Sequence, residues 1–513
     1  MSPETLVLVA LLIPFTGAFL VLFAGPGSAN IRDGLTVITS IILFSVVWQL
    51  IGLVDSGARP SLTLIEMLPG LTITFSLEPL GMIFAGIASF LWILTSFYAF
   101  GYMRAHHEVN QTRFFFCFAI AIMASIGIAF SGNMLTLFVF YEILTISTFP
   151  LVTHSGTDEA RRAGRVYLGI LISTSILFLL TATIWTYVEV GTLDFKQGGI
   201  LSGNTSNGII TVLFGLYIFG IGKAALMPFH RWLPAAMVAP TPVSALLHAV
   251  AVVKAGVFTV IKVSVFIFGL DTLRDTGAST WLAYVAAFTI LAASLVAMRK
   301  DNLKARLAYS TISQLSYIVL GAMLANNIGA MGSTMHIVMH AFAKITLFFC
   351  AGAIIVFAHK TEISDMRGLG RKMPVTFFCF FIASLSIIGL PPFGGMWSKW
   401  YLALAAAETH QYIFIAVLMI SSLLNIAYLM PVVVQGFFGK AAPDDHAHAH
   451  DTDHADHAPM THPLLRHLNF GRRGIAEASA LCLVPIVLTT IGCFALFLYA
   501  DRIRLFLTPV FGG

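Results

Sequence analysis

The sequence predicts an all-α protein that crosses a lipid bilayer many times. Of its 513 residues, 58% are hydrophobic and only 10% are charged, and the mean hydropathy is +0.88. Soluble domains carry about 25% charged residues. A spanning helix needs an apolar run of about 20 residues, and its backbone polar groups are all satisfied within the segment. Repeated runs of that length therefore indicate a polytopic helical membrane protein.

Fourteen apolar runs of about this length can be placed along the chain. They cover residues 3–24, 34–54, 78–102, 113–131, 134–153, 164–190, 208–230, 242–270, 280–298, 303–324, 328–358, 375–407, 411–435 and 475–500. We number these runs segments one to fourteen. The sequence thus predicts about fourteen transmembrane helices.

The basic residues between the segments support this count. If the loops alternate sides, nineteen Lys and Arg residues fall in the odd-numbered loops, and five fall in the even loops and the C-terminal tail. Loops on the cytoplasmic side of a membrane carry such an excess of Lys and Arg. The pattern places both termini on the outer side of a plasma membrane. With basic residues arranged in this way, the net charge of +5 gives no indication of nucleic-acid binding.

Two segments are interrupted in similar ways. The sequence LMPFHRWLP at 226–234 and the sequence LPPFGGMW at 390–397 share a Leu-x-Pro-Phe break and a nearby Trp, and their aligned prolines are 164 positions apart. Paired Pro/Gly interruptions in two halves of a chain point to an inverted-repeat transporter and to its site. We therefore predict two inverted five-helix repeats, segments four to eight and nine to thirteen, each with a broken helix.

The predicted organisation has five parts. They are three N-terminal helices (1–102), the first repeat (113–270), the second repeat (280–435), a cytoplasmic loop rich in His and Asp (436–474), and a last helix with a short tail (475–513).

Residues 222–254 carry the strongest signal of function. This stretch holds Lys223, His248 and Lys254 within apolar surroundings, together with four prolines. A charged side chain at bilayer depth costs about 3 to 15 kcal/mol, so such residues face a bundle interior or a wet cavity. We interpret Lys223 as lying on a broken helix, and His248 and Lys254 as lying on the next helix. The working hypothesis is that these groups handle protons.

Glu142, about halfway along segment five, is the carboxylate that fits such a role. Its distance from a lysine such as Lys223 or Lys254 would set whether that lysine is charged. The alternative is a glutamate that only pairs with a lysine on a neighbouring helix and fixes the packing. For Lys262, which stands alone in the sequence pattern, we favour a structural or snorkelling role.

A second group of titratable residues lies in segment eleven. His336, His340 and Lys344 are spaced i, i+4, i+8, so on a helix they form one stripe. Zinc binding is not favoured, because Lys344 would repel a cation and no carboxylate is near in sequence. Polar packing and a histidine-based proton path remain, and the path is the preferred interpretation. Lys399, just after the break in segment twelve, would end it.

Other features give no catalytic site. The five cysteines lie in apolar segments without metal-ligand spacing, so neither disulfides nor iron–sulfur ligation is expected. The loop 440–467 holds seven of the sixteen histidines and five aspartates, a composition typical of metal binding or proton buffering, or simply of a polar cytoplasmic loop. We expect no cofactor and no metal.

Three stretches resemble a known family. DNLKARLAYSTISQLSY (301–317), GKAALMPFHRWLPAAMVAPTPVSALLHAVAVVKAGVF (222–258) and GLPPFGGMWSKW (389–400) are similar to the signature stretches of the antiporter-like membrane subunits shared by respiratory complex I and the Mrp cation/proton antiporters. The resemblance covers most of segments four to thirteen. It implies a hydrophilic axis along the middle of the membrane. The residues at the matching positions are Glu142, Lys223, His248, Lys254, His336, His340, Lys344 and Lys399.

The chain most resembles the D-type Mrp subunit. Only about thirteen residues follow residue 500, and Lys399 stands where one complex I type has a glutamate. The resemblance implies a proton-translocating subunit of a multi-subunit Na⁺/H⁺ antiporter, with other membrane subunits, protons, sodium and the lipid bilayer as partners. Ser310, Thr311, Ser313 and Gln314 would hold connecting water. The alternatives are the proton-pumping arm of an NADH:quinone oxidoreductase, a hydrogenase or an inorganic-carbon-uptake complex, with the redox chemistry in other subunits, and a purely structural scaffold.

Overall fold

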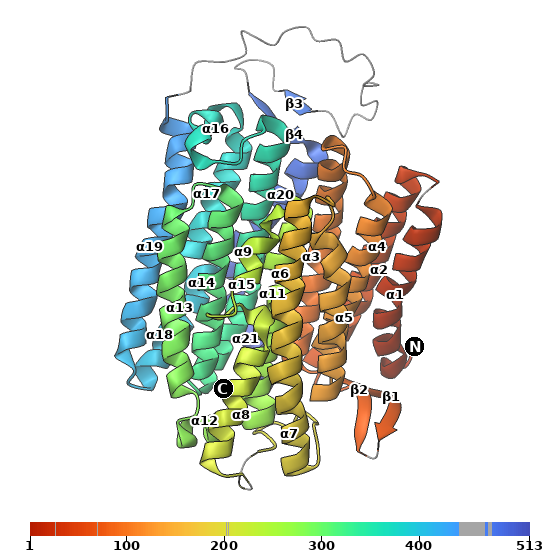
Figure 1. Ribbon diagram of the computed structural model, residues 1–513, viewed down its shortest axis with the longest axis vertical. Helices are drawn as coiled ribbons and strands as arrows, with labels where there is room; N and C mark the ends of the chain where they lie inside the picture. Colours follow the sequence, from red (N-terminus) through yellow and green to blue (C-terminus); the bar gives the residue numbers. More distant parts are fainter. Residues whose placement is uncertain are drawn as a thin grey trace.

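A bundle of long, roughly parallel helices makes up this computed structural model, with two small strand pairs at opposite ends (Figure 1). The structure describes residues 1–440 except 26, 69, 202 and 204, and also residues 467–469 and 475–512. The predicted His/Asp-rich loop lies almost entirely outside the described residues, because 441–466 and 470–474 are not among them.

The first half of the chain contains twelve helices among the described residues. They are α1 (Pro3–Ala24), α2 (Ala29–Asp55), α3 (Pro79–Ala105), α4 (Gln111–Phe130), α5 (Met134–Val152), α6 (Asp158–Thr174), α7 (Thr181–Val190), α8 (Asn207–Gly220), α9 (Trp232–Ala235), α10 (Thr241–Ala245), α11 (Val252–Val263) and α12 (Leu270–Thr276). π-helical segments join α6 to α7 and α10 to α11, so each pair forms one continuous rod. The segments are Ser175–Leu180 and Leu246–Val250.

The described part of the second half contains nine helices and completes the bundle. They are α13 (Thr280–Arg299), α14 (Leu303–Met323), α15 (Asn327–Ala358), α16 (Leu369–Lys372), α17 (Pro374–Ile388), α18 (Gly395–Glu408), α19 (Tyr412–Phe438), α20 (Ala480–Leu498) and α21 (Ala500–Phe511). The antiparallel strand pairs are β1 (Ser61–Leu68) with β2 (Leu71–Ser76), and β3 (His467–Asn469) with β4 (Ala476–Ser479).

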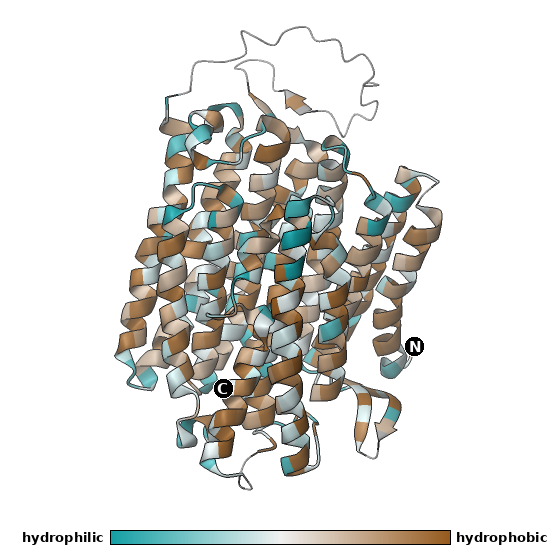
Figure 2. Ribbon diagram, viewed as in Figure 1, coloured by the Kyte–Doolittle hydropathy of each residue, from teal (hydrophilic) through white to brown (hydrophobic). Residues whose placement is uncertain are grey.

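The helices have the length and surface expected of membrane spans. Among the described residues, eleven helical stretches are long and apolar enough to cross a bilayer, and α8 and α17 are shorter apolar helices. Figure 2 shows hydrophobic residues along the middle of the bundle and hydrophilic ones mainly toward its ends. Large apolar side chains are exposed on the outside, such as Phe288 (64% exposed) on α13. The chain is therefore a mostly helical, multi-pass membrane protein, as predicted.

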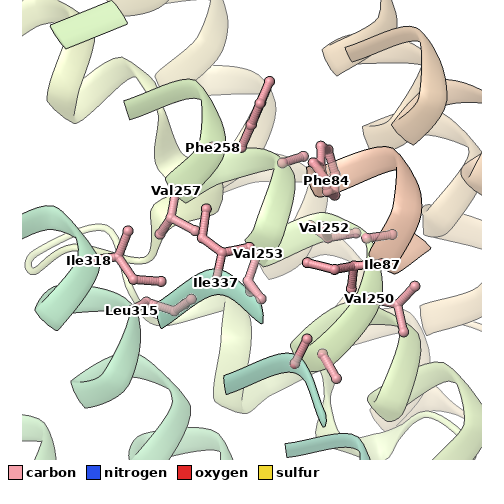
Figure 3. Close-up of a cluster of buried hydrophobic side chains, with 14 of the residues drawn as sticks. Phe84, Ile87, Val250, Val252, Val253, Val257, Phe258, Leu315, Ile318 and Ile337 are labelled. Atoms are coloured by element: carbon pink, nitrogen blue, oxygen red, sulfur yellow. The ribbon is translucent and has the colours of Figure 1, made fainter. Parts of the chain in front are cut away.

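The rod from Thr241 to Phe268 is the central element of the bundle. Every residue in it is buried, and it carries His248, Lys254 and Lys262. Figure 3 shows how its apolar side chains, among them Val253 and Val257, pack near side chains of α3, α14 and α15. A helix that is hydrophobic all round belongs inside a large structure. The charged groups on this rod therefore face protein and not lipid.

Both predicted breaks are present. α8 ends at Gly220, and Lys223 lies in the 3-10 turn Gly222–Ala224 that follows. In segment twelve, α17 ends at Ile388 and α18 begins only at Gly395. The first break comes earlier than the proline motif at 226–234 suggests. The chain leaves the helix at Ile221, Pro228 occupies the irregular stretch that follows, and Pro234 lies within the short helix α9.

Glu477 on β4 fastens the C-terminal region to α17. Its buried carboxylate accepts hydrogen bonds from the N–H groups of Val375 (2.7 Å) and Thr376 (3.2 Å) and from the hydroxyl of Thr376 (2.6 Å). The first N–H groups of a helix have no partner within the helix, so an external acceptor satisfies them. A negative charge at this end also suits the helix dipole.

We expect Glu477→Ala to destabilise the folded protein by about 2 to 4 kcal/mol, because it leaves buried donors unpaired. Thermal unfolding of the purified protein in detergent measures the change. Glu66→Ala on the exposed β1–β2 hairpin is the matched control and is expected to change stability by less than about 0.5 kcal/mol. Equal unfolding temperatures for Glu477→Ala and the unmodified protein would contradict this role.

Candidate functional site

The break after α8 places Lys223 inside the bundle, and nearby side chains compensate the interrupted helix. The N–H of Lys223 donates to the Tyr141 hydroxyl (3.1 Å), and the Trp232 indole N–H donates to the carbonyl of Gly222 (3.0 Å). Non-helical backbone at membrane depth is tolerated only where protein or water satisfies its polar groups. The two aromatic side chains do so here, and they allow a lysine to sit on a turn instead of a helix.

The ammonium group of Lys223 is fully buried against α5. Its Nζ donates to the carbonyl of Tyr141 (2.8 Å) and to the hydroxyl of Thr145 (2.6 Å), and it lies over the ring of Tyr141. Glu142 is near enough to act on Lys223 electrostatically. Its two carboxylate oxygens are buried, and neither has a hydrogen-bond partner among the described residues. Glu142 and Lys223 form no direct ion pair in the described part of the chain, and the Lys223 ammonium group is held by neutral groups.

The central rod meets α15 at Lys254. The Nζ of Lys254 is in hydrogen-bond contact with Nδ1 of His340, although the two residues are 86 positions apart. The ring of His340 stacks on that of His336, with 5.9 Å between centroids. His336 Nδ1 in turn lies 2.8 Å from the hydroxyl of Ser398 on α18. The predicted stripe on α15 thus links the central rod to the second broken element.

Lys399 lies at the far end of this line. Its Nζ donates to the carbonyl of Ile388, which the second break leaves free, and to the hydroxyl of Ser422 on α19, both at 3.0 Å. The ring of Tyr317 lies under the ammonium group at 4.9 Å and also stacks on His336 at 5.7 Å. Tyr317 therefore connects the histidine pair to Lys399. The sequence pattern did not single out Tyr317, although this tyrosine is the last residue of the signature stretch 301–317.

Lys344 reaches Lys399 by a second route. Its Nζ donates to the hydroxyl of Ser310 (2.6 Å), which lies 2.8 Å from the hydroxyl of Tyr428. The Asn425 side chain lies between Tyr428, Gln314 and Lys399. Ser310 and Gln314 thus lie along a chain of polar side chains between Lys344 and Lys399.

Two other hydroxyls of α14 do not join this route. Ser313 pairs instead with Ser294 (3.0 Å). Thr311 bonds only to its own helix.

His248 and Lys223 are the other two buried titratable residues of the site. In the part of the chain that the structure describes, neither forms a hydrogen bond with the line of residues from Lys254 to Lys399. Neither ring nitrogen of His248 has a hydrogen-bond partner among the described residues, and Lys254 and Lys344 are among the charges that act on it. The turn of Lys223 packs against α11 at Gly256, where a Cβ atom would collide with the backbone of Lys223 and Ala224. Glycine at this position lets the first break approach the central rod.

Lys262 has an ion-pair partner, although it stands alone in the sequence pattern. Its Nζ lies 2.7 Å from Glu78 at the start of α3 and donates to the carbonyl of Ser131 (2.8 Å). Glu78 lies 184 positions away along the chain, so the local pattern gave no sign of it. The structural role expected for Lys262 is a buried ion pair and not snorkelling.

We expect Lys262→Met to lower stability by about 3 kcal/mol, because it leaves the Glu78 carboxylate without its counter-charge. The double variant Lys262→Met/Glu78→Leu is expected to recover most of this loss, since it removes both charges. Thermal unfolding of the three proteins in detergent measures the coupling. Additive losses in the double variant would show that the two side chains do not act as a pair.

The family described as NADH:quinone oxidoreductase/Mrp antiporter, TM, matches residues 131–425, which include both breaks and all eight predicted site residues. The chain belongs to this family.

Individual relatives include both complex I and antiporter subunits. The chain is 31% identical over 435 residues to NADH-quinone oxidoreductase subunit N of Desulforudis audaxviator, with 83% of this chain and 82% of the relative covered. It is 28% identical over 449 residues to the D-type subunit of the Na(+)/H(+) antiporter of Alkalihalophilus pseudofirmus, with 85% and 88% covered. The chain spans only 46 to 64% of several longer relatives.

A solved structure shares the fold. A chain in the structure of the Mrp complex from Dietzia sp. DQ12-45-1b superposes with a TM-score of 0.84 at 22% identity, with 100% of this chain and 98% of that chain covered. At this level of identity the match establishes the fold alone. It agrees with the arrangement of long helices described above.

Proposed function

We propose that this chain is a proton-translocating subunit of a multi-subunit Mrp-type antiporter that exchanges sodium for protons. The observation that carries the proposal is the line of contacts from Lys254 through His340, His336 and Tyr317 to Lys399. Buried charges in a membrane protein are expensive and normally mark ion or proton paths. The chain belongs to the NADH:quinone oxidoreductase/Mrp antiporter family, so we interpret this line of contacts as a path for protons.

In the proposed mechanism, protons move between neighbouring titratable groups. Glu142 and Lys223 deliver a proton toward Lys254, whose ammonium group passes one to Nδ1 of His340. His340 and His336 then carry the proton toward Lys399. Glu142 becomes a carboxylate when it gives up its proton, whereas each lysine or histidine donor becomes neutral, so every transfer moves one positive charge one step along the line. His248 and Lys344 lie beside the line and bias it by their charge.

We also propose the finer architecture that the sequence predicts. The described helices support fourteen spans if α8 and the following turns form the seventh and α17 with α18 forms the twelfth. The two breaks, with Lys223 and Lys399 beside them, support inverted repeats over 113–270 and 280–435. Residues 1–102 and 475–513 would flank these repeats.

The proposed location is the inner (plasma) membrane of a bacterium, with both termini on the outer side. The distribution of Lys and Arg supports this orientation. The relatives reported above are bacterial. Labelling a single cysteine introduced at Ser2, in intact cells, with a reagent that does not cross the membrane would test the orientation.

A second candidate function is the membrane arm of an NADH:quinone oxidoreductase or a related complex. The 31% identity to a subunit N favours it. The proton line would serve the same purpose there, driven by redox chemistry in partner subunits. A purely structural scaffold is the third interpretation, and transport that survives neutral replacement of the buried charges would favour it.

Isolation of the native assembly separates the two transport functions. Affinity purification of the tagged chain from its own membranes, followed by mass spectrometry, is expected to yield small membrane subunits without flavin or iron–sulfur proteins. Vesicles holding that assembly are expected to release protons in response to a sodium gradient. Stoichiometric co-purification of redox-cofactor subunits would instead support the respiratory complex.

A further inference from the structure

Three titratable side chains gather at the end of the bundle opposite the β1–β2 hairpin. His106 and Glu108 follow the C-terminal end of α3, and His154 follows α5. The Glu108 carboxylate lies 3.3 Å from His106 Nδ1 and 3.6 Å from His154 Nε2. The side chains of His106, Glu108 and His154 are 43%, 16% and 0% exposed, respectively. The cluster therefore leads from the surface into the protein, with the carboxylate in the middle.

The elements packed around Glu108 bring further charges. Lys304, at the start of α14, acts electrostatically with Glu108, and its Nζ donates to the carbonyl of Ala239 (2.6 Å). Arg113 on α4 donates to the carbonyl of His154 (3.2 Å). Tyr102 on α3 stacks on His106, with 5.7 Å between centroids.

The two histidines of the cluster differ in their affinity for protons. Hydrogen bonding to Glu108 raises the pKa of His106, whereas burial lowers the pKa of His154. His106 is thus the histidine that holds a proton more readily, and it is also the one in contact with solvent. A proton taken up at the surface therefore lies next to the Glu108 carboxylate.

A row of buried polar groups, two of them without a partner among the described residues, begins just below this cluster. Tyr102 lies beside Thr241, the first residue of α10. Thr241, Ser244 and His248 follow one another at helical spacing, so they share one face of the central rod. The hydroxyl of Thr241 faces that of Tyr102, while the hydroxyl oxygen of Ser244 and both ring nitrogens of His248 are buried without a hydrogen-bond partner among the described residues.

Such a row is unusual, because buried polar groups in proteins almost always have a partner, either protein or ordered water. Water needs two to four polar partners to occupy an interior site. Thr241, Ser244 and His248 supply them in succession. The last of the three lies within electrostatic reach of Lys254 and Lys344. The row thus ends beside the buried line of titratable groups.

We propose that Glu108 and the row of Thr241, Ser244 and His248 form a port through which protons pass, by way of water, between this surface and the buried line. The port rests on the proposed function. Glu108 accepts a proton from the His106 imidazolium, and the neutral ring regains one from bulk water. The Glu108 carboxylic acid gives its proton to water in the row, and each hydroxyl releases one proton as it accepts another. His248 receives the proton, and Glu108 is again a carboxylate.

The first experiment compares Glu108→Gln with Asp158→Asn in the complete assembly, purified and reconstituted into vesicles. Both variants remove one carboxylate from the same end of the molecule, but Asp158 is fully exposed and starts α6 away from the row. A pH-sensitive dye on this side reports proton uptake. We expect Glu108→Gln to slow uptake about tenfold or more, as loss of a positioned proton-transfer group does. Asp158→Asn is expected to stay near the unmodified rate.

The second experiment separates a proton path from a structural ion cluster. Thr241→Val/Ser244→Ala removes one hydroxyl that has no protein partner among the described residues and one that faces only Tyr102, so the folded assembly is expected to keep its stability within about 1 kcal/mol. Uptake is nevertheless expected to fall severalfold, and Thr241→Ser, which keeps the hydroxyl, is expected to retain it.

Three outcomes distinguish the possibilities. Unchanged uptake in both Glu108→Gln and the double variant would overturn the port. So would slower uptake that only matches a lower amount of assembled protein. If Lys223→Ala in the same vesicles also leaves uptake unchanged, the proposed function fails, and not only the port.

Discussion

Lys223→Ala is expected to abolish proton-coupled cation transport while the subunit still assembles. Loss of a positioned proton-transfer group typically lowers rates by about 100-fold or more. Assembly should survive because the partners of Lys223 remain satisfied: the hydroxyl of Thr145 also donates to the carbonyl of Tyr141 (3.1 Å). Removing a buried charge from a membrane protein also removes its desolvation cost.

Lys223→Arg is the variant that decides between proton carrier and structural cation. Arginine keeps the positive charge but does not release its proton in proteins. A carrier role predicts that this variant is as inactive as Lys223→Ala, whereas a purely structural charge would be partly preserved. Lys300→Ala, at an exposed position, controls for loss of one positive charge. Exchange is measured as sodium-driven pH change in vesicles that contain equal amounts of assembled complex.

Glu142→Ala is expected to match Lys223→Ala in the same assay. The carboxylate of Glu142 has no hydrogen-bond partner to lose among the described residues, so truncation should leave the packing of α5 intact. Transport should fail because the carboxylate that acts on Lys223 is gone. Normal exchange in either correctly inserted variant would refute the assignment of this pair.

Interrupting the histidine pair is the second change with a large expected effect. His340 is the hydrogen-bond partner of Lys254 in the described structure, and His336 continues the line to Ser398 and Tyr317. We expect His340→Gln to lower exchange by about 100-fold, because a glutamine can hydrogen-bond to Lys254 but cannot gain or lose a proton. A structural role for His340 predicts instead that glutamine preserves most of the activity.

Thr334→Val on the same helix is the matched control for the histidine variants. Thr334 is buried, and its hydroxyl donates to the carbonyl of Ala330 on its own helix (2.9 Å). Its replacement removes one polar group from α15 without touching the line, so exchange should remain near the unmodified rate. Equal losses in Thr334→Val and His340→Gln would indicate that α15 responds to any polar change, and would remove the support for a relay.

Much of the site could be predicted from residue type and position. Glu142, Lys223, Lys254 and Lys399 stood out because each interrupts an apolar run, and bilayer energetics make such residues rare. The spacing of His336 and His340 correctly placed them on one face of a helix, since helical periodicity is local. Lys262 was harder to interpret, because its partner Glu78 lies at the start of a different helix.

By itself, the sequence determined that this is a multi-pass helical membrane protein, which of its segments are broken, and which titratable groups lie within apolar segments. These properties follow from hydropathy and backbone chemistry over about twenty residues or fewer. Only the tertiary structure decided that Lys254 meets His340, that Tyr317 joins His336 to Lys399, and that Lys223 bonds to Tyr141 and Thr145 and not to Glu142. Such contacts depend on how each helix is rotated and shifted against its neighbours, which is set by packing across the whole bundle.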